Sequence, residues 1–242
     1  MEWHDEGIVI SVRPHGETGA VAEIFTRSHG RHLGLIHGGR SRRLRPALQT
    51  CNHVDVVWRA RLNEQLGTFT VELKSGFAAA VMDRPLPLLG LESLAALSHV
   101  LPERDPHPSL FEVTLFVFEF LDDDGAWPAL LARWELALLE ELGFGLDLGS
   151  CAATGATDDL IYVSPKSGRA VSRGAGEPFK DRLLALPRFL LPGNSSSVAA
   201  PDVLAAFVLT GYFLEKRVCE PQGTALPEVR ARMLVRLVGR RL

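Results

Sequence analysis

The sequence predicts an α+β protein in which a small N-terminal β-barrel is followed by a mainly α-helical C-terminal domain. Two observations predict this fold class. Apolar residues alternate with polar ones in short runs over residues 6–77, as in half-buried strands. Beyond the prolines at 85 and 87 the apolar spacing changes to that of amphipathic helices. We therefore place the domains at residues 1–80 and 81–242.

Five short strands are expected in the first domain. Their apolar runs begin near Ile8, Val21, Leu33, Val54 and Phe69, and glycines separate the runs as turn or bulge residues. Closing such a sheet removes its exposed edges, so a small closed barrel is favoured. An oligonucleotide-binding (OB) barrel is the leading interpretation, and an SH3-like barrel is the alternative.

The second domain is expected to be helical. Asp83–Pro87 contains two prolines that interrupt a regular element, which marks the boundary. Ser109 and Glu112 have the spacing of a capping box at the start of a helix. Residues 150–176 are rich in Gly, Ser and Thr and predict a short hairpin or loop insert. Helical spacing extends over residues 88–101, 110–121, 127–142, 201–218 and 227–238.

Composition favours a globular protein with reduced thiols. The hydrophobic fraction is 46% and the charged fraction 23%. No apolar run reaches the roughly 18 residues of a membrane span. The three cysteines are far apart without a C-x-x-C pair, and the acidic start Met1–Glu6 is unlike a signal peptide. We expect a cytoplasmic protein with no membrane partner.

Charge is distributed unevenly along the chain. Basic and acidic residues number 10 and 8 in residues 1–80, 3 and 13 in residues 81–150, and 13 and 8 in residues 151–242. No carboxylate lies between Glu23 and Asp55, and that interval holds six arginines, from Arg27 to Arg45. We call residues 27–45 the acid-free stretch. Clustered guanidinium groups favour a polyanionic partner, and a solubilising loop is the alternative.

The barrel therefore carries the predicted nucleic-acid contacts. Those residues are Arg13, Arg31, Arg40, Arg42, Arg43, Arg45, Arg59, Arg61 and Lys74. Arg59, Arg61 and Lys74 would extend the basic patch across the barrel. Trp58, Phe69 and Phe25 either stack bases or fill the barrel core, and the core is favoured.

No catalytic motif is present. Phosphate-loop, dinucleotide-binding, zinc-protease and serine-hydrolase signatures are absent. Cys51 and His53 lack an orienting carboxylate, and Asp122–Asp124 is typical of a solvated loop. The histidines do not have the spacing of a standard metal site. Those histidines are His29, His32, His37 and His53. We predict a non-enzymatic protein without catalytic or metal-binding residues.

Several short motifs occur in a fixed order along nearly the whole chain. They are Gly7–Ile10, Gly16–Thr18, Ile24–Thr26, Gly30, Gly38–Ser41, Leu66–Phe69, Trp134–Phe144 and Ser164–Gly168. In this order they resemble the bacterial RecO family. The resemblance implies an OB barrel, a helical C-terminal domain and a role in recombinational DNA repair.

The resemblance also implies partners. Members of the family are recombination mediators that bind single- and double-stranded DNA, anneal complementary strands, and act with RecR to load RecA onto strands coated by single-strand-binding protein. The acidic, apolar C-terminal tail of that protein would suit the basic C-terminal helices. The residues expected to bind it are Arg217, Arg230, Arg232 and Arg236. A cytoplasmic, nucleoid-associated location follows.

One position departs from the family pattern. Many relatives hold zinc with four cysteines in the insert, but here only Cys151 remains, and Thr154 and Ser172 stand where further cysteines are expected. One thiolate does not hold a structural zinc, so no cofactor is predicted.

Three other functions stay open on the sequence. An RNA-binding or ribosome-associated OB protein would show the same barrel and basic patch. An enzyme would use Cys51 and His53 or the acidic loop. A protein-interaction scaffold would bind no nucleic acid at moderate salt.

Overall fold

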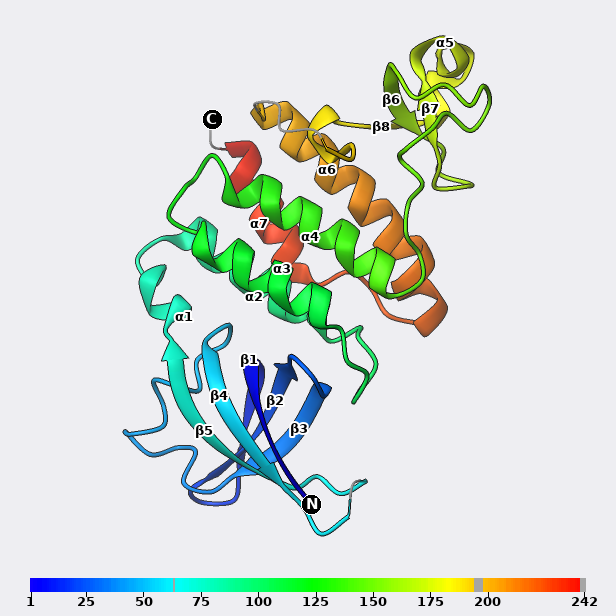
Figure 1. The fold of residues 1–242 in the computed structure, drawn as a ribbon. Helices are drawn as coiled ribbons and strands as arrows, with labels where there is room; N and C mark the ends of the chain where they lie inside the picture. The colour runs from blue at the N-terminus through cyan, green and yellow to red at the C-terminus, as the bar shows by residue number, and fades with distance from the viewer. Residues whose placement is uncertain (63, 194–197, 240–242) are drawn as a thin grey trace. The chain divides into compact units, whose positions relative to one another are not determined.

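The computed structural model describes residues 1–62, 64–193 and 198–239. Its first five strands close into a barrel in the order β1-β2-β3-β5-β4 (Figure 1). Only β3 and β5 pair in parallel among these five strands. The strands are β1 (Glu2–His15), β2 (Gly19–Thr26), β3 (Gly30–Ile36), β4 (His53–Arg59) and β5 (Thr68–Ser75). The expected fold class, a five-stranded barrel followed by helices, is confirmed.

The barrel buries side chains both in its interior and on the outer face that the helices cover. Trp58 and Phe69 fill the interior, with exposed fractions of 0% and 3%. Ile8–Ile10 are all buried, because helix α2 contacts the outer face of β1. Phe25 is also buried, and its ring meets Phe111 of α3 edge-on at a centroid distance of 5.6 Å. The alternative in which these aromatic side chains stack on bases is therefore wrong. The favoured interpretation, that Trp58, Phe69 and Phe25 are core residues, is correct.

Three helices belong to the same compact unit as the barrel, Met1–Glu119. They are α1 (Phe77–Ala80), α2 (Pro85–Ser98) and α3 (Pro108–Glu119). The expectation that the prolines at 85 and 87 interrupt structure was wrong, because Pro85 occupies the first turn of α2, where no backbone N–H is needed. The expected capping box is also absent: α3 begins before Ser109, and Glu112 pairs with Arg27 instead.

The second compact unit is Phe120–Leu242. A three-stranded sheet in the order β7-β6-β8 forms the insert, which extends past residue 176, and a π-helical turn (Leu214–Cys219) follows α6. Its helices and strands are α4 (Trp127–Glu141), β6 (Leu160–Val163), β7 (Ala170–Ser172), α5 (Arg173–Gly176), β8 (Leu184–Ala185), α6 (Ala200–Phe213) and α7 (Glu228–Gly239), with short 3-10 turns at Glu177–Arg182, Arg188–Leu190 and Glu220–Gln222. The division into domains at residues 80 and 81 stays a prediction.

A buried ion pair lies at the centre of the second unit. Glu135 on α4 is 0% exposed and accepts hydrogen bonds from Arg230 Nε at 2.7 Å and Nη2 at 2.9 Å. Thr210 on α6 donates to the same carboxylate, and Arg230 Nη2 also donates to the Phe207 carbonyl at 2.7 Å. Three helices are therefore joined through one carboxylate. In the described part of the chain, no helix combines the length and apolar character that crossing a bilayer requires.

Candidate nucleic-acid interface

The arginine loop, residues 37–52, connects β3 to β4 and carries the second half of the acid-free stretch. Leu44, Ala47 and Leu48 pack against the barrel core. Because the backbone turns like a helix, with Arg45 N–H donating to Ser41 O and Leu48 N–H to Leu44 O, residues three and four apart share one face. That face is buried. The intervening arginines are therefore directed to solvent by a loop that is fixed at its base.

Two glycines set the start of this loop. Gly38 has a positive φ of 64°, which favours glycine. A Cβ on Gly39 would lie 2.8 Å from the Ala20 Cβ, so only glycine fits against β2. The next residue is held as well, since Arg40 N–H donates to Thr18 O at 3.1 Å and its Nη1 donates to Glu17 O at 3.0 Å. The loop is thus tied to the β1–β2 turn.

Three arginines of the loop are not engaged by the fold. Arg42, Arg43 and Arg45 are exposed, and their guanidinium groups make no ion pair or hydrogen bond within residues 1–62, 64–193 and 198–239. Two grooves lie beside Arg42 and Arg45. The first groove, about 510 Å³, is lined by Arg40 and Arg45, and the second, about 690 Å³, by Arg42 and Arg45. A polyanion would find these charges already placed and uncompensated.

The first half of the acid-free stretch is used differently. Arg31 on β3 pairs with Glu23 on β2 and donates from Nε to the Leu101 carbonyl at 2.8 Å. Glu23 is only 5% exposed and also meets His99 Nδ1 at 3.0 Å. Burial acts to raise the pKa of Glu23, but the hydrogen bonds from His99 and Arg31 outweigh it and lower that pKa to about 2. Arg31 therefore belongs to the interior ion-pair network and is not a free phosphate contact.

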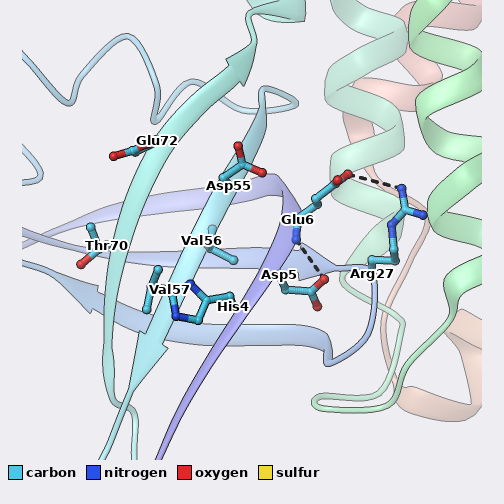
Figure 2. A pocket seen from close by; sticks show the side chains of 9 residues that line it. All are labelled: His4, Asp5, Glu6, Arg27, Asp55, Val56, Val57, Thr70 and Glu72. Atoms are coloured by element: carbon cyan, nitrogen blue, oxygen red, sulfur yellow. Dashed lines mark hydrogen bonds and ion pairs between the residues drawn. The ribbon is translucent and has the colours of Figure 1, made fainter.

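Arg27 is engaged in the same way. Its guanidinium pairs with Glu6 at 3.3 Å and with Glu112 of α3, and it lies over the Phe111 ring at 5.3 Å from the centroid. Figure 2 shows the Arg27 side chain bent toward Glu6. These contacts join the end of β2 to α3, so Arg27 fastens the helix to the barrel.

An acidic hollow of about 610 Å³ lies on the outer face of β1, β4 and β5 (Figure 2). Its acidic lining residues are Asp5, Glu6, Asp55 and Glu72. Lys74 Nζ pairs with Glu6 at 2.5 Å, and Arg59 makes a two-point ion pair with Glu2 at 2.7 and 3.0 Å. The expected extension of the basic patch through Arg59 and Lys74 is therefore interrupted by carboxylates, because cross-strand pairing neutralises both cations.

Two further predicted contacts stand apart from the loop. Arg13 is exposed on β1, and Arg61 is exposed just after β4. Neither side chain has an ion partner among the described residues. Neither lines the two grooves that the loop arginines line. Of the nine predicted residues, the structure brings Arg40, Arg42, Arg43 and Arg45 together.

The four arginines expected to bind a partner tail lie in different settings. Arg230 is 4% exposed and is taken up by Glu135, so we remove it from the predicted partner surface. Arg217 lies over the Phe213 ring at 4.6 Å and reaches the Phe144 carbonyl at 3.5 Å. Arg232 and Arg236 are exposed on α7, four residues apart and so on one helix face.

The weak catalytic candidates have structural roles. Cys51 is 0% exposed, donates its thiol to the Leu91 carbonyl at 3.1 Å, and has a pKa raised far above the ordinary thiol value by burial. Burial lowers the pKa of His53, whose Nε2 lies 3.2 Å from Glu6. Asp123 Oδ1 accepts the Gly125 and Ala126 amides ahead of α4, as a turn aspartate does.

The four histidines considered as metal ligands in the sequence, His29, His32, His37 and His53, form no metal-binding cluster among the described residues. His29 stacks on Trp3 at 4.0 Å and pairs with Asp5, whereas His32 is buried beside Trp3 and Trp58. Burial lowers the pKa of His32 to about 4, and the nearby charge of Arg104 acts in the same direction. Within the described residues no three His, Cys, Asp or Glu side chains are grouped for a metal ion.

The donors around Cys151 do not fit the zinc site that the family resemblance implies. Its sulfur accepts hydrogen bonds from Ser172 N–H at 3.3 Å and Ser172 Oγ at 3.4 Å. Burial raises the pKa of Cys151, but the bonds from Ser172 and Thr154 outweigh that effect and lower it to about 6. A structural zinc needs four ligands drawn from Cys and His, and here hydroxyl groups and backbone amides surround a single thiol.

Sequence reasoning missed the apolar side chains next to the arginine loop. Leu73, at the end of β5, and Met82, just after α1, are 47% and 67% exposed and line the second groove. Glu92 of α2 lines it as well. The sequence carried no signal for this surface, because Phe69, Val71 and Leu73 continue one apolar alternation although only Leu73 of the three is exposed.

Comparisons with known proteins agree over the full chain. The family model "Recombination protein O N terminal" matches residues 1–77, and "Recombination protein O C terminal" matches residues 94–224. The chain is 54% identical over 246 residues to a DNA repair protein RecO of Methylorubrum populi, with 100% of each chain covered. It is 55% identical to one of Methylobacterium nodulans, with 95% of each covered, and 51% identical to one of Brucella abortus, with 99% and 97% covered.

Proposed function

Because the chain belongs to the RecO family of DNA repair proteins, we propose that it works in recombinational repair by binding DNA and makes or breaks no bond itself. Its substrates are single- and double-stranded DNA, and its activity is the annealing of complementary strands. The observation that carries the proposal is the arginine loop, where Arg40, Arg42, Arg43 and Arg45 project from a fixed base.

The physical support lies in uncompensated charge. Holding guanidinium groups close together without carboxylates costs free energy through mutual repulsion, and a polyanion removes that cost on binding. Arginine donates in a planar fork that matches phosphate oxygens. Such contacts are indifferent to base sequence, as annealing of arbitrary strands requires.

We further propose that the chain acts with RecR to load RecA onto strands coated by single-strand-binding protein, in the cytoplasm at the nucleoid. The exposed Arg232 and Arg236 on α7, together with Arg217, are the residues we assign to the acidic tail of the single-strand-binding protein. Replacing Arg232 and Arg236 with Ala should weaken binding of that tail in an anisotropy titration and leave binding of bare DNA unchanged.

The salt dependence of DNA binding tests the loop assignment. In a variant with Arg40, Arg42, Arg43 and Arg45 all changed to Ala, the slope of log affinity against log salt for duplex DNA should fall by about 3–4, at about 0.9 per phosphate contact. A matched control changes Arg27 and Arg31, which are already paired, to Lys. An unchanged slope in the fourfold variant would show that the loop is not the phosphate contact.

A second measurement separates this function from RNA binding. In a competition assay, single-stranded DNA and RNA of the same sequence compete for binding to the protein. In a separate assay, annealing is followed on DNA strands coated with single-strand-binding protein. DNA should compete at least equally and annealing should occur on coated strands. Preference for RNA without annealing would favour the RNA-binding alternative.

A further inference from the structure

The two grooves beside the arginine loop share a wall. Arg45 and Gln49 line both, Arg40 also lines the first groove, and Arg42 also lines the second. Gln49 is held in place by its side-chain amide, which donates to the Arg45 carbonyl at 3.0 Å. Two adjoining hollows are therefore each lined by two arginines.

The second groove differs from the first in its lining. Leu73 and Met82 are large apolar side chains that the fold leaves 47% and 67% exposed, and Ala79 and Leu88 continue the same wall. Exposing apolar surface next to arginines is unfavourable for the free protein, and an unbranched Met adapts its shape to different partners. The groove thus has the character of a binding surface for an apolar group carried by an anion.

We propose that the second groove receives an unstacked base of a single-stranded nucleic acid, while Arg42 and Arg45 hold the phosphates on either side of it. This inference rests on the proposed function and adds to it the place where a base, as distinct from the backbone, is bound. Trp58, Phe69 and Phe25 are buried, so none of these three aromatic rings is available to stack on a base.

Three observations favour a single strand over other anions. A strand repeats phosphate and base, and the two grooves share Arg45 while each has a further arginine in its lining, Arg40 in the first and Arg42 in the second. Glu92 lines the second groove, where a carboxylate would accept hydrogen bonds from the exocyclic amino groups of bases. In a duplex the base faces are stacked and unavailable to Leu73 and Met82, so the groove distinguishes single strands from duplexes.

The test removes apolar surface without changing charge. Leu73→Gln with Met82→Gln keeps side-chain size at two exposed positions, so the fold is retained. A matched control, Val208→Gln with Val235→Gln, alters two side chains that are 63% and 72% exposed elsewhere. Anisotropy titrations over a range of salt use a labelled mixed-sequence single strand, the same sequence as a duplex, and a peptide of alternating Asp and Phe.

We expect the groove variant to bind the single strand about tenfold more weakly than the wild type, with the salt slope and the duplex affinity unchanged. The control should bind like the wild type. Equal single-strand affinity in the groove variant overturns the groove assignment while DNA binding stands. A wild type that binds neither DNA form overturns the proposed function itself. Peptide binding that the groove variant loses, with single-strand affinity intact, makes the groove a peptide site and also overturns the proposal.

Discussion

Arginines have different roles in the two halves of the acid-free stretch. Arg27 and Arg31, in and just after the β2–β3 turn, are taken up by carboxylates and by the Leu101 carbonyl. Arg42 and Arg45, on the arginine loop, face solvent and line grooves. Both halves contain arginines and no carboxylate, so this feature of the composition does not distinguish an internal arginine from one available to a ligand.

The difference arises from what the fold brings opposite each half. β2 and β3 pair with Glu23 opposite Leu33, which makes Arg31 a diagonal neighbour of Glu23 on the same face. Glu112 reaches Arg27 from α3. Among the described residues no carboxylate forms an ion pair with Arg42, Arg43 or Arg45, although Glu92 of α2 lines the second groove beside two of them. Partners distant in sequence therefore decide which arginines stay available.

The largest expected effect concerns the second unit, where α7 also carries both buried and exposed arginines. Arg230→Met leaves the carboxylate of Glu135 buried without its cation, and the free energy of unfolding should fall by about 3–5 kcal/mol. Arg232→Met on the same helix is the matched control and should change it by less than about 0.5 kcal/mol. Urea unfolding followed by tryptophan fluorescence measures both. If the two variants are equally stable, the division between internal and available arginines does not hold there.

Arg31→Ala should lower the free energy of unfolding by less than Arg230→Met does, since His99 still donates to Glu23. We expect a loss of about 2 kcal/mol in the free energy of unfolding at neutral pH. The folded pKa of Glu23, about 2, lies below its ordinary value of 4.5, so its stabilising contribution is present above pH 4.5 and is lost as the pH falls toward 2. The wild-type advantage over Arg31→Ala should therefore shrink in that window. Arg42→Ala, the control, should unfold like the wild type at every pH.

His32 provides a smaller test within the same stretch. Its folded pKa, about 4, lies below the ordinary 6.5, so the unfolded chain takes up a proton first and stability falls as the pH drops from 6.5 toward 4. Between pH 6.5 and pH 5 the wild type should lose about 1–2 kcal/mol relative to His32→Phe. Replacing the exposed His37 with Phe should leave the pH dependence of the wild type intact. Parallel stability curves for wild type and His32→Phe would contradict the burial of a neutral imidazole.

Much of the fold was predictable from sequence because the apolar period and the glycine turns are local signals. The barrel and the helical second part followed from them, and the basic stretch followed from the distribution of charge. The fate of Arg31 and Arg230 was not predictable, because each depends on a carboxylate, Glu23 or Glu135, placed by tertiary packing. The second groove was missed for the same reason: Leu73 and Met82 are unremarkable apolar residues until the loop lies beside them.

The smallest expected effect separates the two halves directly. Arg42→Ala should lower the slope of log duplex affinity against log salt by about 0.9, because one phosphate contact and its released counterion are lost. Arg27→Ala should leave that slope unchanged, since Arg27 is already paired with Glu6 and Glu112, and should reduce stability by no more than about 1 kcal/mol because these partners are partly exposed. Anisotropy titrations at several salt concentrations measure the slopes, and urea unfolding of the same preparations measures the stabilities. A slope change in Arg27→Ala as large as that in Arg42→Ala would mean that DNA displaces the Arg27 ion pairs, and the stretch would then act as one continuous surface.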